Sequence, residues 1–398
     1  MSTTQENRTT PNVLIDEDWL AAQIRAQGFD LAHVAPPRPA ATIGAFRAWL
    51  EGGHHGAMAY LARPDSVHKR ADPRHIKPSC RTVLTVAMNY YTHPLPDELR
   101  DDPARGLMSR YAWADNYYHV LAPRLRALAE ALEARLERPV VARAYAGDGP
   151  ILEKALAAEG GLGFVGKNTL LIHPELGSWL FLGELLLDVE LPPLALPPNP
   201  GAAKARAAGC GTCTRCLEVC PTGALTAPYF LDAQRCISYL TIELKGSIPR
   251  DLRPLIGHRV FGCDLCQDVC PWNQRFARPT SDAAFQPRED AAAPLLLDLM
   301  ALDDKAFRLR YRGNPILRAK RHGLLRNVTV ALGNWGDPAA IPALAQALAD
   351  PHPLIREHAA WALGRVGGGR ARQALGAART VETDPQVQAE IGLSLAEG

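Results

Sequence analysis

Apolar and polar residues follow a helical rhythm in three segments of the first half of the chain. In each segment apolar residues recur at intervals of three and four, the spacing of one helix face. Glycines follow the first two segments and would end a helix there. We therefore expect helices at 14–27, 43–50 and 121–136.

Runs of β-branched and apolar residues in the same half predict buried strands. A charged, proline-rich segment, 63–77, precedes the first of them and is expected to be a loop. Helices that alternate with strands indicate a layered domain of the α/β or α+β class. The expected strands are 82–88, 140–145, 170–172 and 179–189.

A repeated pattern occupies the end of the chain from about Leu324. The sequence ALGNWG at 331–336 returns as ALGRVG at 362–367, a shift of 31 residues. Asp-Pro pairs at 337–338 and 350–351 mark turns between helices. This pattern is typical of HEAT-like helical pairs, which stack to bury a shared core.

Composition adds limits to this picture. The 398 residues are 47% hydrophobic and 22% charged, as in an ordinary water-soluble protein of two or three domains. The net charge of +2 gives no global sign of nucleic-acid binding, so such a surface would have to be local. Residues 1–12 are polar and are expected to form a disordered tail. With no targeting pattern and no run of apolar residues of membrane-spanning length, we expect a cytoplasmic protein.

Eight of the nine cysteines lie between 210 and 270 and carry the strongest chemical signal. The first run is Cys-x2-Cys-x2-Cys-x3-Cys-Pro, and the second is Cys-x2-Cys-x3-Cys-Pro. In bacterial ferredoxins the first three cysteines of such a run hold one iron–sulfur cluster, and the fourth crosses to the other. Cys236, which stands alone between the runs, can replace the leading cysteine that the second run lacks.

Two 4Fe–4S clusters therefore follow from the spacing, with crossed ligand sets. Paired structural zinc sites are the alternative, although zinc sites present pairs of Cys-x2-Cys more often than this triple. A disulfide framework fits poorly in a long chain with no secretory signal. The predicted sets are Cys210, Cys213, Cys216 and Cys270 for one cluster, and Cys220, Cys236, Cys263 and Cys266 for the other.

A second informative stretch runs from 147 to 169. Asp148 stands in a glycine-flanked turn after a predicted strand, where its carboxylate could face a pocket or cap the helix that follows. Gly161 to Lys167 has the spacing of a phosphate-binding loop, but it follows a helix, and Asn168 replaces the expected Ser or Thr. We expect these glycines to allow close approach of the backbone to a flat or bulky ligand.

With these motifs the chain resembles the epoxyqueuosine reductase family. The resemblance extends from about Trp49 to about Gly367 and rests on non-cysteine residues as well as on the paired cysteine runs. It is carried by GLGFVGKNT at 161–169, GSW at 177–179, LGE at 182–184, CISYLTIE at 236–243 and GCDLCQDVCPWN at 262–273.

The resemblance implies a cobalamin in the N-terminal domain, beside the nearer of two 4Fe–4S clusters. It also implies the last step of queuosine biosynthesis, the removal of an epoxide oxygen at the wobble base of a tRNA. That reaction takes two electrons and two protons, so it needs a reductant and an acid. The electron donor would be a partner that the sequence does not identify.

Residue roles follow from the same resemblance. The family's acid is an aspartate shortly before a proline, and Asp148 is the carboxylate available there, with a pKa raised by burial against the corrin. The family has two residues between aspartate and proline, whereas this chain has one, and the segment 111–119 is also one residue longer. The implied cobalamin contacts are Arg70, Tyr111, Asp148, Lys167, Asn168, Ser178 and Ser238.

A basic segment precedes the helical repeats. On its own it could be a solvated helix face, but resemblance to a tRNA-modifying enzyme favours phosphate binding. We expect the tRNA to be recognised by shape and backbone, with the wobble base extruded into the corrin pocket. Within this segment we assign tRNA binding to Arg318, Lys320 and Arg321. The segment comprises Arg308, Arg310, Arg312, Arg318, Lys320, Arg321 and Arg326.

The overall prediction is an α+β protein of three domains. Two other functions remain open: a ferredoxin-type electron carrier with appended domains, and a reductive dehalogenase-like corrinoid enzyme acting on a small molecule. The predicted parts are a tail at 1–12, an α/β cobalamin-binding domain at 13–190, a proline-rich linker at 191–201, a ferredoxin-like two-cluster domain at 202–285 and a HEAT-like, tRNA-binding domain at 286–398.

Overall fold

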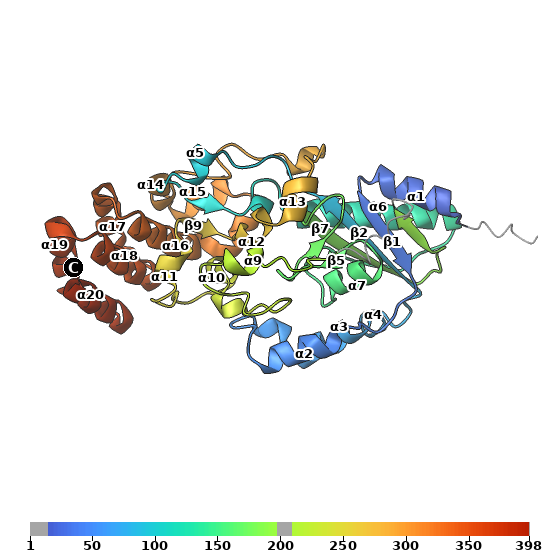
Figure 1. Cartoon of the computed structure of the whole chain (residues 1–398), viewed down its shortest axis with the longest axis horizontal. Helices are drawn as coiled ribbons and strands as arrows, with labels where there is room; N and C mark the ends of the chain where they lie inside the picture. Colours follow the sequence, from blue (N-terminus) through green and yellow to red (C-terminus); the bar gives the residue numbers. More distant parts are fainter. Residues whose placement is uncertain (1–14, 197–208, 398) are drawn as a thin grey trace, which may run out of the picture.

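The chain forms an elongated molecule with a sheet domain at one end and helical repeats at the other (Figure 1). The structure is a computed structural model and describes residues 15–196 and 209–397. The cysteine-rich loops lie between the two ends (Figure 1). The tail at 1–12 lies outside the described residues. Within the described part, no helix is both long and apolar enough to cross a membrane.

A five-stranded sheet in the order β4-β7-β2-β1-β8 forms the N-terminal core. Every neighbouring pair is antiparallel, so this domain is α+β and not a parallel α/β unit. The central strand, β2, is buried along its whole length because helices cover both faces of the sheet. The strands are β1 (Leu31–Ala35), β2 (Thr82–Asn89), β4 (Ala142–Tyr145), β7 (Leu180–Leu187) and β8 (Leu194–Leu196).

The predicted strands at 82–88, 140–145 and 179–189 are confirmed, whereas β1 and β8 were not expected. β8 corrects the predicted linker at 191–201, because residues 194–196 pair with β1 instead of running free. The remainder of that linker lies outside the described residues. The predicted strand at 170–172 is the short β6 (Leu171–Ile172), which pairs with β5 (Phe164–Val165).

Helices α1 (Glu17–Ala26) and α6 (Tyr117–Leu136) cover one face of the sheet, and α7 (Glu153–Glu159) covers the other. Helix α2 (Ile43–Glu51) confirms the prediction for 43–50. The predicted loop at 63–77 is wrong: it contains α3 (Pro64–Ala71) and α4 (Pro73–Ile76). Each begins with a proline at its first position, where the missing N–H is no loss and the fixed φ suits a helix.

The cysteine region consists of short helices joined by loops. Strand β9 (Arg259–Phe261) of this region pairs in parallel with β3 (Leu107–Met108). The helices are α9 (Arg215–Glu218), α10 (Ile237–Ile242), α11 (Arg253–Ile256), α12 (Leu265–Asp268) and α13 (Pro271–Phe276).

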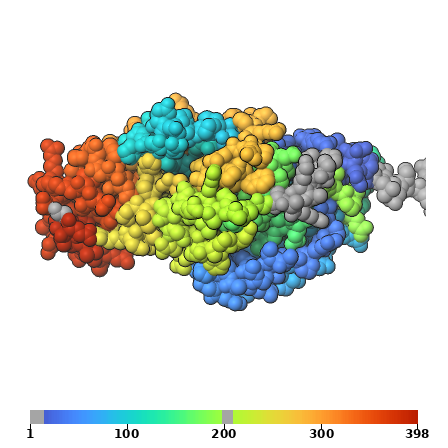
Figure 2. Space-filling view, in the orientation of Figure 1, coloured from blue at the N-terminus to red at the C-terminus, as the bar shows by residue number. Residues whose placement is uncertain are grey.

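The domains are interleaved, which corrects the linear boundaries predicted at 190, 201 and 285. Met108 donates its backbone N–H to Ala292, and Leu107 donates to His258, so the segment 104–113 packs into the core of the C-terminal half. In the other direction, Phe285 packs into the sheet domain. In Figure 2 the cyan segment that contains α5 (Asp97–Arg100) lies against orange chain from the C-terminal half.

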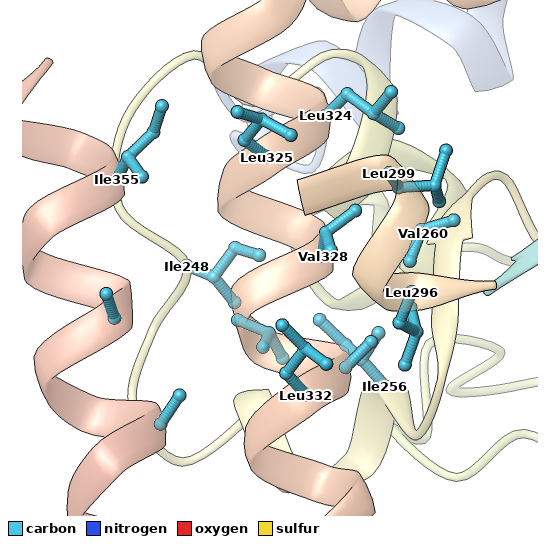
Figure 3. Packing of buried hydrophobic residues seen from close by; sticks show 14 of the residues in the cluster. Ile248, Ile256, Val260, Leu296, Leu299, Leu324, Leu325, Val328, Leu332 and Ile355 are labelled. Carbon is cyan, nitrogen blue, oxygen red and sulfur yellow. The ribbon is translucent and has the colours of Figure 1, made fainter. Parts of the chain in front are cut away.

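The C-terminal helices confirm the repeat. Gly333 in the first copy packs against Ala362 of the next helix, and Gly364 in the second copy packs in turn against Ser394. Leu324, Val328 and Leu332 of α16 meet Ile256 and other buried residues of neighbouring elements (Figure 3). The helices are α14 (Leu296–Met300), α15 (Asp304–Arg310), α16 (Lys320–Trp335), α17 (Ile341–Ala347), α18 (Pro353–Val366), α19 (Gly368–Arg379) and α20 (Pro385–Glu397).

A buried ion network joins the helical repeats to the cysteine region. Arg253 of α11 contacts Glu357 of α18 at 2.7 Å and Glu390 of α20 at 3.0 Å. Arg250 binds Glu390 and the more exposed Glu397. The repeats are therefore fixed to the segment 245–257 by charged groups as well as by apolar packing.

Candidate functional site

The first predicted cysteine set surrounds one cavity. Cys210, Cys213, Cys216 and Cys270 line a space of about 170 Å³, together with Trp272 and other residues from both flanking loops. Burial raises the pKa of the Cys216 thiol, and the nearby sulfurs of the same set raise it further. Cys270 comes from the second cysteine run, so the structure brings together the four residues that the crossed assignment requires.

The second set gathers in the same way. Burial and then the neighbouring sulfurs of Cys263 and Cys236 raise the pKa of the Cys266 thiol well above its usual value. Cys236 stands at the start of α10, whose first backbone N–H groups point at its sulfur, and it interacts with Cys220. Cys266 also interacts with Cys216 of the first set, so the two sets adjoin.

Lys167 and Asn168 tie the glycine-rich segment to the cysteine loops. The Lys167 ammonium donates to the carbonyls of Gly211 at 2.7 Å and Cys213 at 2.9 Å, and its backbone N–H lies 3.3 Å from the Cys210 sulfur. The Asn168 amide donates to the Cys266 carbonyl at 3.4 Å. Both residues therefore contact the cysteine loops in the protein alone, and the cobalamin contacts that the resemblance implied for them stay a prediction.

Ser178 is also occupied by the cysteine region. Its hydroxyl donates to Gln267 at 3.0 Å and accepts from the Asn273 amide at 2.9 Å. A Cβ at the preceding Gly177, whose φ is +75°, would lie 2.2 Å from Asn273 Oδ1. The GSW and PWN motifs thus form one buried contact between the sheet domain and the cysteine loops, and Ser178 acts in that contact.

The glycines at 160–166 serve internal packing, which corrects the expectation of a ligand-facing backbone. A Cβ at Gly160 would meet the His33 ring at 2.5 Å. A Cβ at Gly163 would meet the Ile172 carbonyl oxygen at 2.5 Å, and one at Gly166 would meet the Ile172 side chain at the same distance. The segment needs glycine because it lies directly against β1 and β6.

Asp148 lies exposed in the turn after β4. Its carboxylate accepts a hydrogen bond from the backbone N–H of Ala146 at 3.0 Å, so it stabilises its own turn. It does not cap the next helix: α7 has Leu152 at its N-cap, with no side-chain hydrogen bond. The capping alternative is therefore wrong, and Asp148 is not buried in the protein alone.

Several groups near this turn were not anticipated from the sequence. A Cβ at Gly147 would lie 3.0 Å from the Tyr117 hydroxyl. Burial raises the Tyr117 pKa, the charges of Glu153 and Asp148 raise it further, and the Arg318 guanidinium opposes them. Arg318 itself binds Glu243 at 2.8 Å. Residues from the sheet domain, the cysteine region and the C-terminal half thus converge beside Asp148.

Arg70 and Tyr111 lie on the same side of the molecule as this turn. Arg70 is buried, donates to the Ser66 carbonyl at 3.2 Å and interacts electrostatically with Glu153. The Tyr111 ring lies 6.4 Å from the Tyr117 ring, and burial raises its pKa well above the usual value.

Ser238 is half-buried in the first turn of α10, two residues after Cys236. Of the implied cobalamin contacts, the structure brings Arg70 and Tyr111 toward Asp148 and places Ser238 beside the second cysteine set.

Two carboxyl groups lie beneath the Asp148 turn. Glu184 in β7 is completely buried, and burial raises its pKa well above the usual value. Glu153 at the start of α7 accepts a hydrogen bond from the Gly147 N–H at 2.8 Å, and burial raises its pKa to about 7. Glu184 belongs to the LGE sequence at 182–184, and Glu153 ends the sequence PILE at 150–153. Their spacing in the sequence does not indicate that the two carboxyl groups lie close together.

The basic segment divides into paired and exposed cations. Arg321 binds Asp350 at 2.8 Å, and Arg326 is fully buried and donates to three backbone carbonyls. In the predicted tRNA-binding trio Arg318 and Lys320 are both exposed, but Arg318 binds Glu243, so Lys320 is the exposed member without an ion pair among the described residues. The other exposed cations of the segment are Arg308, Arg310 and Arg312.

Comparison with known families agrees with this arrangement. Residues 209–273 match the 4Fe-4S double cluster binding domain, which confirms the predicted two-cluster region. Residues 316–396 match HEAT repeats, which confirms the helical repeats. Residues 70–146 match the family described as Epoxyqueuosine reductase QueG, DUF1730.

Individual relatives extend the similarity over most of the chain. An epoxyqueuosine reductase of Pseudomonas aeruginosa is 45% identical over 327 residues, covering 80% of this chain and 86% of that protein. The Escherichia coli epoxyqueuosine reductase is 38% identical, covering 88% and 90%.

Solved structures give the same result. A crystal structure of epoxyqueuosine reductase with an epoxyqueuosine-modified tRNA-Tyr stem loop matches with a TM-score of 0.85 at 29% identity, covering 96% of this chain and 98% of that one. The Bacillus subtilis enzyme, in a structure whose catalytic aspartate loop is swung out of the active site, matches over the same shares with a TM-score of 0.83.

Proposed function

The chain belongs to the epoxyqueuosine reductase family, and from this premise we propose that it reduces epoxyqueuosine to queuosine at the wobble position of tRNA. The chain covers most of the length of its relatives, and its structure matches one that was solved with a modified tRNA stem loop. The observation that carries the proposal is the convergence of Asp148, Tyr117 and Arg318 beside two cysteine sets of 4Fe–4S type.

Electrons enter through the two clusters in this proposal. The crossed sets adjoin at Cys216 and Cys266, so an electron can pass between them over a short distance. Lys167 places a positive charge beside the loop of the first set and so favours its reduced state. We assign Cys210, Cys213, Cys216 and Cys270 to one cluster, and Cys220, Cys236, Cys263 and Cys266 to the other. The physiological reductant would be an electron-donor protein or small carrier.

Cobalamin is the proposed centre between the clusters and the substrate. When bound, it would supply a cobalt that accepts single electrons and acts on the substrate as a two-electron reductant. The donors near Asp148 fit the amide-bearing rim of a corrin, because Arg70 and the Tyr117 hydroxyl offer hydrogen bonds beside an exposed turn. Arg70, Tyr111 and Ser238 would hold the group, while Lys167, Asn168 and Ser178 fix the cysteine loops next to it.

Asp148 is the proposed general acid. Loss of the epoxide oxygen as water requires two protons, and Asp148 is the exposed carboxyl of this turn. Glu153 holds the neighbouring Gly147 N–H and so fixes the turn from below.

The tRNA would lie along the exposed cations of the C-terminal half. Lys320, Arg308, Arg310 and Arg312 offer charge to phosphates, whereas Arg321 and Arg326 are bound within the protein. Arg318 lies near Tyr117, on which the Asp148 charge also acts, and would meet the extruded nucleotide. A tRNA substrate also places the enzyme in the cytoplasm.

The test is anaerobic reconstitution followed by a direct assay. The protein is loaded with iron, sulfide and cobalamin, and iron, cobalt and conversion of epoxyqueuosine in a tRNA-Tyr stem loop are measured. Bound cobalt, about eight irons per chain and formation of queuosine are expected. Iron without cobalt or turnover would instead favour an electron carrier. Turnover of a halogenated small molecule but not of the stem loop would favour a dehalogenase.

A further inference from the structure

Glu184 occupies an unusual position in the centre of the sheet. It lies on β7 between Leu182 and Leu186, and its register partners are Thr85 on β2 and Tyr145 on β4. Its side chain has no exposed surface. Neither carboxyl oxygen has a hydrogen-bond donor in the described part of the chain. An ionised carboxylate in such a place costs several kcal/mol, so Glu184 must be neutral or must share a proton.

Glu153 is the neighbour with which Glu184 can share. Helix α7 lies over the middle of β7 and places the Glu153 carboxyl within reach of that of Glu184. A hydrogen bond between two carboxyl groups requires that one of them carries a proton. Burial raises the pKa of both groups. Glu153 raises the pKa of Glu184 further, whereas the hydrogen bond with Glu184 lowers the pKa of Glu153.

The pair connects directly to the Asp148 turn. One Glu153 oxygen accepts the Gly147 N–H at 2.8 Å, one residue before Asp148, and the Asp148 charge acts on both glutamates. The opposite face of Gly147 touches Tyr117. The turn that presents the proposed acid is thus held between a tyrosine and a buried carboxyl pair.

We propose that Glu153 and Glu184 share one proton at neutral pH and form a proton store for Asp148. This inference rests on the proposed function for its catalytic part. In the reaction both C–O bonds of the epoxide break, a carbon–carbon double bond forms, and the oxygen leaves as water. Two electrons from the clusters and two protons balance the step. Asp148 delivers both protons in succession. It regains the second from the pair while the pair takes up a replacement from solvent, so the two glutamates are not left ionised together.

The other charged or titratable groups around the pair are consistent with this role. Lys154 follows Glu153 but donates to the Thr169 carbonyl at 2.7 Å. Arg70 approaches Glu153 from α3, Tyr145 lies opposite Glu184, and Tyr117 stands beyond Gly147. Neither Arg70 nor Lys154 forms an ion pair with Glu153 or Glu184 among the described residues, so the shared proton is what relieves the buried charge.

The first test is infrared spectroscopy of the cluster-loaded protein at pH 7. We expect a protonated carboxyl band that disappears in Glu184→Gln and persists in the control Glu175→Gln, an exposed glutamate outside the site. A wild-type spectrum without this band, or a band unaltered in Glu184→Gln, would overturn the shared proton. This readout does not depend on activity, so it stands even if the assay on the tRNA stem loop fails.

The second test is the pH profile of single-turnover reduction of the stem loop. Glu184→Gln should lose about 10-fold or more in rate above pH 7 and recover toward the wild-type rate in acid, where solvent can protonate Asp148. Its affinity for the stem loop should stay unchanged. Profiles of Glu184→Gln and wild type that superimpose would contradict the proton store. An inactive wild type would instead count against the proposed function alone.

Discussion

At the scale of single residues, the environment of each carboxyl decides its role. Asp148 is exposed and bonded only to its own turn, whereas Glu153 begins α7 and Glu184 is buried in β7, and burial raises the pKa of both glutamates. Two kinds of carboxyl side by side are the arrangement expected for delivery of a proton at one position and its storage at another.

Asp148→Asn removes the proposed acid without changing the shape of the side chain. The amide oxygen can still accept from Ala146, so the turn should keep its conformation. We expect turnover of epoxyqueuosine to fall by about 100-fold or more, with iron and cobalt content unchanged. The matched control is Asp298→Asn on α14, an exposed aspartate outside the site. Turnover by Asp148→Asn that equals that of the control would remove Asp148 from the mechanism.

Cys266→Ala tests the crossed ligand sets. Loss of one thiolate from the second set should release that cluster and lower the iron content from about eight to about four per chain. The natural control is Cys80→Ala, because Cys80 is buried in the sheet domain and belongs to neither set. Iron analysis and electron paramagnetic resonance of the reduced protein measure the outcome. Full iron content in Cys266→Ala would refute the assignment.

The sequence predicted these residues to different degrees. Cysteine spacing predicted both ligand sets because the motif itself sets the geometry of a cube, and the structure brings those eight residues together. The sequence analysis did not identify Glu184. A single charged residue in the apolar strand sequence LFLGELLL does not show whether its side chain faces another residue or solvent. The contacts of Lys167 and Ser178 with the cysteine region were not predicted, since a motif shared by a family does not tell which protein groups each side chain contacts; their cobalamin contacts stay a prediction.

At the scale of secondary-structure elements, period and length decided what could be predicted. Long elements such as α6 and β2 have enough apolar positions to define their rhythm. β8 has three residues and α4 has four, too few to show any period. The prolines in 63–77 led to the wrong prediction of a loop. Proline breaks a helix when it stands in the interior, but it is favoured at the first helical position, where Pro64 and Pro73 stand.

Lys320 and Arg312 should supply part of the electrostatic binding of tRNA. Both are exposed, one at the start of α16 and the other between α15 and the next helical turn. The double replacement by alanine should weaken tRNA binding and lower the slope of log affinity against log salt by about 1 to 2. Arg370→Ala, an exposed arginine of α19, is the control. An unchanged slope in the double variant would exclude these residues from the interface.

Arg253→Met should loosen the attachment of the helical repeats. Its removal leaves Glu357 and part of the Glu390 carboxylate buried without their main cation, which costs about 3–5 kcal/mol. The urea midpoint of the helical repeats, followed by circular dichroism, should fall. Arg372→Met on the exposed side of α19 is the control. A midpoint equal to that of the control would mean that packing alone holds the repeats.

His358 predicts acid sensitivity of the same junction. It is fully buried, its Nδ1–H donates to the Leu354 carbonyl, and its Nε2 accepts from the Ile248 N–H at 3.1 Å. Burial, and then two nearby arginines, lower its pKa well below the usual value, so the folded protein keeps it neutral.

Because the unfolded chain takes up a proton at His358 below about pH 6.5, stability should fall by up to about 1.4 kcal/mol per pH unit as pH decreases below that value. His358→Gln should flatten this part of the stability profile in thermal melts between pH 5 and 7. A variant profile as steep as the wild-type profile would assign the acid sensitivity to other groups.

At the scale of the whole molecule, the site exists only where three parts of the chain meet. Asp148 comes from the sheet domain, Glu243 from the cysteine region and Arg318 from the start of the helical repeats. Sequence analysis predicted all three parts but not their interleaving, because pairing between β3 and β9 joins Leu107 to Arg259, which follows 152 positions later in the chain. The candidate site is therefore assembled by long-range contacts that no local pattern encodes.

The interleaving has a consequence for how the protein is made. Met108 leaves the ribosome early, yet its hydrogen-bond acceptor, Ala292, follows about 180 residues later. At about 5–20 residues per second, this apolar segment waits about 10–40 s for its partner during translation. During that time the nascent chain exposes β3, whose partner strand, β9, has not yet been synthesised. A slow-growing chain would thus depend on chaperones at this step, and a truncated sheet domain expressed alone would retain an unpaired, aggregation-prone strand.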